Sequence, residues 1–121
     1  MRSIGGEYEE KASKYLEGLG YGIVERNFTI RGGEVDIVAR EGGDTVFIEV
    51  KARRNASFGG PFEAVTPAKR RRIVKTALFY LKKNGIKIEN IRFDVLGITE
   101  AGGKTEFELI KDAFYAEGYY V

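Results

Sequence analysis

The chain has 121 residues, 43% of them hydrophobic and 31% charged, which is the composition of a single globular domain. Its 20 Lys and Arg nearly balance its 18 Asp and Glu, so binding to nucleic acid or to a membrane depends on where the basic residues lie. Cys and His are both absent, which excludes disulfides, zinc fingers and imidazole catalysis, and leaves oxygen ligands, suited to Mg²⁺ or Mn²⁺, for any bound metal.

The first half of the chain predicts one helix followed by three strands. The helix is expected over about residues 6–19, because its apolar residues form one stripe at ~100° per residue: Tyr8, Ala12, Tyr15, Leu16 and Leu19. Strands are expected at residues 21–30, 34–40 and 45–53. Glycine-containing turns separate these strands, so they should form an antiparallel meander.

The second half predicts a long helix and two more strands. Thr66 and Pro67 are typical of a helix start, and the helix is expected to end at Lys83. Strands follow at 91–99 and 105–110. A crossover helix between the third and fourth strands should make those two strands parallel. The prediction is a single α/β domain over residues 1–121, with the order α-β-β-β-α-β-β and a mixed five-stranded sheet flanked by helices.

Three charged residues interrupt strands that are otherwise apolar. Asp36 lies in the second strand, and Glu49 and Lys51 lie on one face of the third. Adjacent strands can bring Asp36 beside Glu49, and two neighbouring carboxylates repel unless a cation lies between them. Such a site suits a divalent ion that activates water against a phosphodiester. The alternative is an ordinary Glu–Lys pair on a solvated sheet face, and the strand charges alone leave the two interpretations even.

The order of Asp36 followed by Glu49-Val50-Lys51 resembles the PD-(D/E)xK signature of the restriction-endonuclease-like superfamily. The chain is also similar to the YraN family of small bacterial proteins, predicted endonucleases related to archaeal Holliday-junction resolvases, over about residues 6–114. The segments that carry this similarity are 33–39, 46–51, 58–61, 63–69 and 92–95. The resemblance implies a restriction-endonuclease-like fold and Mg²⁺- or Mn²⁺-dependent hydrolysis of branched or otherwise non-standard DNA. Because related resolvases work as dimers, it also suggests a homodimer.

The resemblance further implies roles for individual residues. Asp36 and Glu49, a glutamate of the first helix and the carbonyl of Val50 would hold the metal, and Lys51 would assist the attacking water. The family pattern in that helix is Gly-Glu-x-x-Ala-x-x-Tyr-Leu, and Glu9 fits it.

Two points of this assignment rest on position alone. Tyr8 replaces the glycine of the family pattern, but Glu9 lies at the edge of the apolar stripe whereas Glu7 and Glu10 point away. Glu34 shares the face of Asp36 and is either an outer metal ligand or the partner of an Arg.

Basic residues gather at the start of the second helix, where Lys69, Arg70, Arg71 and Arg72 are consecutive. Cations at a helix N-terminus interact unfavourably with the helix dipole, at a cost of about 0.3–1 kcal/mol each. A bound phosphate would instead be attracted both by the helix N-terminus and by the basic side chains. We expect these four residues, together with Arg53 and Arg54, to contact nucleic acid. The alternative is a solvated charged face. By resemblance, Lys69 corresponds to a family lysine that reaches the active site.

The sequence therefore favours a metal-dependent DNA endonuclease. The alternatives are a non-cleaving nucleic-acid- or protein-binding module on the same fold, and a metal-dependent ribonuclease. Two aromatic features stay open: Phe58 is a base wedge or a loop anchor, and residues 114–121 are a dimer contact or a cover for the sheet. No apolar run approaches the ~20 residues needed to span a membrane, and residues 1–6 have no signal-peptide core, so a cytoplasmic location is expected.

Overall fold

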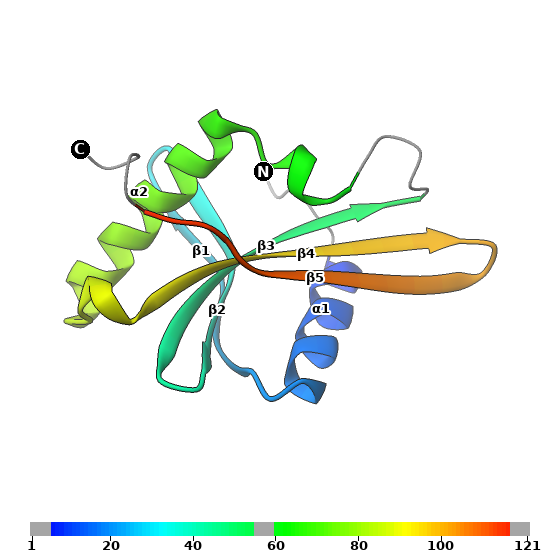
Figure 1. Ribbon diagram of the computed structural model, residues 1–121, viewed down its shortest axis with the longest axis horizontal. Coiled ribbons are helices and arrows are strands. Elements are labelled where there is room, and N and C mark those ends of the chain that lie inside the picture. Colours follow the sequence, from blue (N-terminus) through cyan, green and yellow to red (C-terminus); the bar gives the residue numbers. More distant parts are fainter. Residues whose placement is uncertain (1–5, 55–59, 117–121) are drawn as a thin grey trace.

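The computed structural model describes residues 6–54 and 60–116, and it confirms the predicted class and element order (Figure 1). Short 3₁₀ turns at Phe62–Ala64 and Ile88–Asn90 precede α2 and β4. None of the helices in these residues is long and apolar enough to cross a membrane. The main elements are α1 (Gly6–Gly18), β1 (Gly22–Ile30), β2 (Gly33–Glu41), β3 (Asp44–Arg53), α2 (Pro67–Asn84), β4 (Ile91–Ala101) and β5 (Lys104–Phe114).

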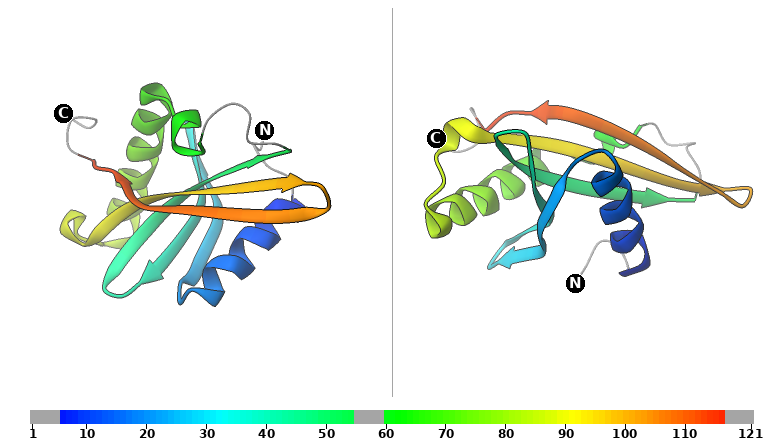
Figure 2. Two further views of the ribbon diagram at one scale, coloured as in Figure 1. Left: turned by 45° about the vertical axis from the view of Figure 1, so that its right-hand side comes forward. Right: turned by 90° about the horizontal axis from the view of Figure 1, so that it is seen from below.

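The five strands form one mixed sheet in the order β1-β2-β3-β4-β5. β3 and β4 are parallel, as a crossover through α2 requires, and the other neighbouring pairs are antiparallel. Both views in Figure 2 show the β4–β5 hairpin extending farther than the end of β3.

Side-chain alternation along β3 divides the core into two layers. Phe47 packs with residues of α2, whereas Ile48 and Val50 pack with Ala12 and Leu16 of α1. The two helices therefore cover opposite faces of β3, in agreement with the apolar residues at both parities of this strand. Glu49 and Lys51 have the same parity as Phe47, so they face the α2 side.

β2 and β3 separate before either strand ends. Their pairing stops at Ile37 opposite Ile48, although β2 continues to pair with β1 back to Gly33. Beyond this point β3 pairs with β4, where Glu49 lies opposite Val95. Asp36 and Glu49 are the first residues past the separation, so backbone groups that the ladder would otherwise occupy become available between the two strands.

The structure corrects three details of the expected elements. Leu19 lies beyond the end of α1 and is 49% exposed, so it does not belong to the buried stripe. β5 continues past residue 110 to Phe114, because a bulge at Asp112, where φ is +56°, restores pairing between Phe114 and Phe93. On α2 the buried face also includes Thr76 and Tyr80.

The described part of the aromatic tail covers the sheet. Phe114 is buried and its ring stacks on Phe93 with centroids 4.9 Å apart, and Ala116 joins the same core layer. Residues 117–121, and Phe58 in the loop after β3, lie outside the described residues.

Candidate active site

A pocket of about 270 Å³ opens where β2 and β3 separate, beneath the first turns of α2. We call it the Asp36 pocket. It contains three carboxylates and three cations, and only one of its side chains is apolar. Its lining residues are Gly33, Glu34, Asp36, Glu49, Lys51, Lys69, Arg72 and Ile73. The strand acids and the helix cations, predicted separately from the sequence, are thus brought to one place.

A carboxylate oxygen of Asp36 accepts a hydrogen bond that a backbone carbonyl of the neighbouring strand would ordinarily accept. Its side chain is buried, with the residue only 2% exposed, and its Oδ2 accepts the Val50 N–H at 2.8 Å. Both backbone groups of a strand residue point toward the same neighbouring strand. The Val50 carbonyl therefore also faces the side of β2, beyond the last paired residues.

Asp36, which is buried, and Glu49, which is largely buried, form an acidic pair that shares a hydrogen bond. Burial, together with the negative charges of Glu49 and Glu34, raises the pKa of Asp36 to about 8. The hydrogen bond from the Val50 N–H acts in the opposite direction and lowers this pKa. Burial also raises the pKa of Glu49, opposed chiefly by Lys51. At neutral pH the metal-free pair therefore holds a proton that a divalent cation would displace.

Lys51 and Lys69 supply positive charge on the α2 side of this pair. The Lys51 Nζ lies 3.4 Å from Glu49 Oε2, and the two side chains are only 16% and 11% exposed. A hydrogen bond with Lys51, burial and the charge of Lys51 all lower the pKa of Lys69. Two lysine amines this close together repel each other, and the negative charge of Glu49 offsets part of that repulsion.

The close approach of the β1–β2 hairpin to α2 places Arg72 in the pocket. A Cβ on Gly33 would lie 2.1 Å from the Thr76 Oγ1 and 3.2 Å from the Arg72 carbonyl, so only glycine permits this contact. The same Thr76 hydroxyl donates to the Arg72 carbonyl at 2.8 Å. The hairpin therefore fixes the position of the α2 residues that line the Asp36 pocket.

The other expected nucleic-acid contacts occupy different surroundings. Arg70 is partly buried, donates its Nε to the Val65 carbonyl at 2.9 Å, and lies 4.3 Å from the centroid of the Phe62 ring, so it fixes the segment before α2. Arg71 is exposed on α2 and Arg54 is exposed after β3. Arg53 is partly buried in a separate recess beside Pro61, Thr99 and Glu106.

Glu9 is buried on α1, as its place at the edge of the apolar stripe predicts. It does not line the Asp36 pocket, whereas Glu34 does. Within residues 6–54 and 60–116 the side chains of Asp and Glu form no group of three or more that could hold a metal ion.

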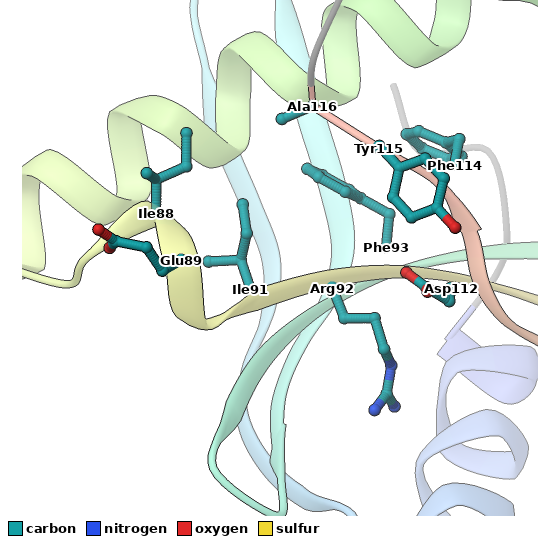
Figure 3. A pocket seen from close by; sticks show the side chains of 9 residues that line it. All are labelled: Ile88, Glu89, Ile91, Arg92, Phe93, Asp112, Phe114, Tyr115 and Ala116. Carbon is teal, nitrogen blue, oxygen red and sulfur yellow. The ribbon is translucent and has the colours of Figure 1, made fainter.

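A second pocket, of about 230 Å³, lies at the other end of the sheet between β4 and β5 (Figure 3). Ile88, Ile91 and Phe93 line it, and the Arg92 side chain points away from them. Arg92 instead donates to Glu41 at 2.8 Å. Because Glu89, Arg92 and Asp112 also line this pocket, its walls are both polar and apolar.

Asp94 is a buried polar residue to which the sequence pattern assigned no role. It is fully buried and accepts hydrogen bonds from the Tyr21 hydroxyl at 2.7 Å, the Arg92 Nε at 2.9 Å and the Asp112 N–H at 2.9 Å. An Asp inside an apolar strand with an Arg two residues before it was the available signal. Because both oxygens accept from donors, this carboxylate joins β4, β5 and the start of β1 rather than presenting a ligand site.

Comparison with known proteins identifies close relatives. A UPF0102 protein of Geobacter sulfurreducens is 54% identical over 96 residues, which is 79% of this chain and 75% of that protein. UPF0102 proteins of Syntrophus aciditrophicus and Pelobacter propionicus are 47% and 48% identical, over 88% and 93% of this chain and 84% and 83% of theirs. Residues 8–98 match the group described as "Uncharacterised protein family UPF0102", and the chain belongs to this family.

Proposed function

We propose that this protein is a metal-dependent endonuclease that hydrolyses phosphodiester bonds of branched or otherwise non-standard DNA. In this proposal it is a YraN-like member of the restriction-endonuclease-like, PD-(D/E)xK superfamily. The observation that supports it most is the largely buried pair of Asp36 and Glu49 at the separation of β2 and β3, with Lys51 beside it. A fold optimised for stability alone would not place two acids and two lysines in one small pocket.

The donor set suits Mg²⁺ or Mn²⁺. Asp36, Glu49 and the Val50 carbonyl are oxygen ligands, and the raised pKa of each acid means that a cation would relieve an unfavourable interaction. When bound, such an ion would polarise the phosphate and acidify a water. Glu9, which the resemblance adds as a further ligand, is buried on α1 and is not among the residues that line the pocket.

The surrounding cations would bind and orient the substrate. Lys51, held by Glu49 at 3.4 Å, is placed to position the attacking water or to stabilise negative charge on the phosphate. Lys69 and Arg72 line the same pocket from α2 and would contact the non-bridging oxygens. A phosphate bound there would also offset the repulsion between Lys51 and Lys69.

The test is cleavage of a panel of labelled substrates with Mg²⁺ or Mn²⁺: duplex, single strand, flap, four-way junction and RNA. Lys51→Ala should abolish cleavage while leaving DNA affinity nearly intact, since one lysine adds little to a footprint of many phosphates. Arg71→Ala combined with Arg72→Ala should weaken binding to all sequences. It should also lower the salt dependence by roughly one unit of slope for each phosphate that is no longer bound.

The outcomes separate this proposal from its alternatives. Branched-DNA binding without cleavage of any substrate, with either metal, would favour a non-cleaving module. Cleavage of RNA alone would favour a ribonuclease. Undiminished cleavage by Lys51→Ala would place the activity elsewhere or in a contaminant.

A further inference from the structure

Positive charge is concentrated on α2, whereas the rest of the chain carries a net negative charge. Seven of the 18 residues of α2 are Lys or Arg and none is acidic. The other 103 residues carry 13 Lys and Arg against 18 Asp and Glu, a net charge of −5, although the whole chain is +2. A helix whose cations have no acidic neighbours at i+3 or i+4 attracts a polyanion along its length.

One line of exposed residues on α2 begins in the Asp36 pocket. Arg72, Lys75, Phe79 and Lys83 follow one another at spacings of three and four residues, so they lie on one side of the helix. We call them the α2 stripe. Arg72 lines the pocket, and the stripe continues from it for about 16 Å at 1.5 Å per residue. Figure 1 shows α2 running from the 3₁₀ turn at Phe62–Ala64 toward the start of β4.

Phe79 is the unusual member of the α2 stripe. It is 53% exposed, and its ring leans on Phe28 of β1 with centroids 6.3 Å apart. The Lys83 Nζ lies 5.6 Å from the centroid of the same Phe28 ring. Phe79 therefore packs on Phe28 on one side, while about half of the residue is exposed to solvent between the cations of the stripe.

We propose that the α2 stripe binds an unpaired DNA strand, with a base stacked on Phe79 and phosphates on Arg72, Lys75 and Lys83. This inference rests on the proposed function, because it names the form of DNA that enters the Asp36 pocket. In a duplex the base faces are covered by their neighbours, and only base edges, sugars and phosphates are exposed, so Phe79 has no flat partner. An unpaired strand offers both groups, and cations combined with stacking aromatics are how proteins hold single strands.

The length of the stripe agrees with this occupant. About 16 Å corresponds to roughly three to five nucleotides of one strand. A strand that ends its path at Arg72 brings a phosphate to the Asp36 pocket. The substrate is thus DNA with an unpaired arm, and the cut falls close to that arm.

The test measures binding in EDTA, where no cleavage occurs, by fluorescence anisotropy of labelled dT20 and of a 20-base-pair duplex. Phe79→Ala and Phe79→Leu should weaken dT20 binding by roughly 5- to 100-fold, the effect of one stacked base, with less than about a threefold change for the duplex. Phe79→Tyr should retain wild-type binding. Tyr115→Ala removes an aromatic that is 61% exposed but lies outside the α2 stripe, and it should change neither affinity.

Several results would overturn the inference: equal losses for dT20 and duplex, unchanged binding by Phe79→Leu, no wild-type binding of dT20, or binding of rU20 but not of dT20. Thermal melts of each variant show whether the fold is retained, and Phe79→Leu preserves most of the apolar contact with Phe28. Cleavage is scored separately. If the wild type cuts DNA but Phe79 variants bind dT20 normally, only this inference fails. If dT20 binding depends on Phe79 but nothing is cut, only the nuclease proposal fails.

Discussion

Replacing Asp36 by asparagine should stabilise the metal-free protein, although it removes a residue that we place in the active site. The asparagine side chain can still accept the Val50 N–H, and its amide can donate to Glu49. What the substitution removes is a buried carboxyl whose pKa is raised to about 8 by burial and by Glu49. The wild-type fold therefore works against ionisation of this group, whereas the unfolded chain does not.

The sign and size of the effect follow from that pKa. Below about pH 4 Asp36 is protonated in both the folded and unfolded states and contributes no pH dependence. Between about pH 4 and pH 8 the folded state retains a proton that the unfolded state has released, so the free energy of unfolding decreases as pH rises, by at most ~1.4 kcal/mol per pH unit. At pH 7 this amounts to about 4 kcal/mol as a ceiling, and to the order of 2–4 kcal/mol once water entry relaxes the site.

The assay is urea unfolding in EDTA at about pH 5, 7 and 8, with Glu106→Gln as a control for removing an exposed carboxylate from β5. Asp36→Asn should be more stable than wild type, by a margin that grows with pH, and Glu106→Gln should show no such growth. Adding Mg²⁺ or Mn²⁺ should reverse the order, because an ion bound only by the folded wild type stabilises it by RT ln(1 + [L]/Kd).

Two results would refute this reasoning. An Asp36→Asn protein that is no more stable than wild type at pH 8, with an unchanged pH dependence, would mean that the carboxyl is not strained in the fold. Equal metal binding by the two proteins, measured by calorimetry, would place the metal site elsewhere.

Two further substitutions test how the site is positioned. Gly33→Ala should cost about 1–3 kcal/mol in urea unfolding and reduce cleavage, because its Cβ would lie 2.1 Å from the Thr76 Oγ1 and push α2 away from β2, and adding Thr76→Ala should recover part of the loss. Asp94→Ala should lower the free energy of unfolding by roughly 3–5 kcal/mol, because the Arg92 guanidinium and two other donors lose their shared acceptor. Metal binding at Asp36 should persist if the variant folds. Loss of both stability and metal binding would show that the two sites are coupled.

The element order and the pairing of the strands could be predicted because they depend on local patterns. Alternation in β3 placed Glu49 and Lys51 on the face of Phe47, and the Thr66 side chain does accept the Lys69 N–H at 3.3 Å as a helix N-cap should. The class of the sheet followed from the crossover through α2. These features required no knowledge of distant contacts.

The details that were missed depend on contacts between distant segments. The continuation of β5 to Phe114 results from a bulge at Asp112, whose N–H is bound by the buried Asp94 carboxylate. Neither Asp94 nor Asp112 belongs to an alternating apolar pattern that would predict the continuation of β5 from the sequence. Arg70 similarly belonged to a basic run in the sequence, and only the fold shows that it binds the Val65 carbonyl and packs on Phe62. Helical spacing alone cannot separate such a residue from Arg71 beside it.

Several features of the Asp36 pocket are unfavourable on their own, and the two ligands that we propose would offset them. Asp36 and Glu49 repel each other when both are ionised, and the positive charges of Lys51 and Lys69 likewise repel each other. Arg72 adds a further cation near the N-terminus of α2, where the helix dipole disfavours positive charge. A divalent cation between the acids and a phosphate between the lysines and Arg72 would neutralise each in turn. Since the acids of the strands and the cations of α2 line one small pocket, the two ligands would also contact one another. In our proposal this arrangement of charge would favour a metal-bound phosphodiester over either ligand alone, which is what hydrolysis at this position would require.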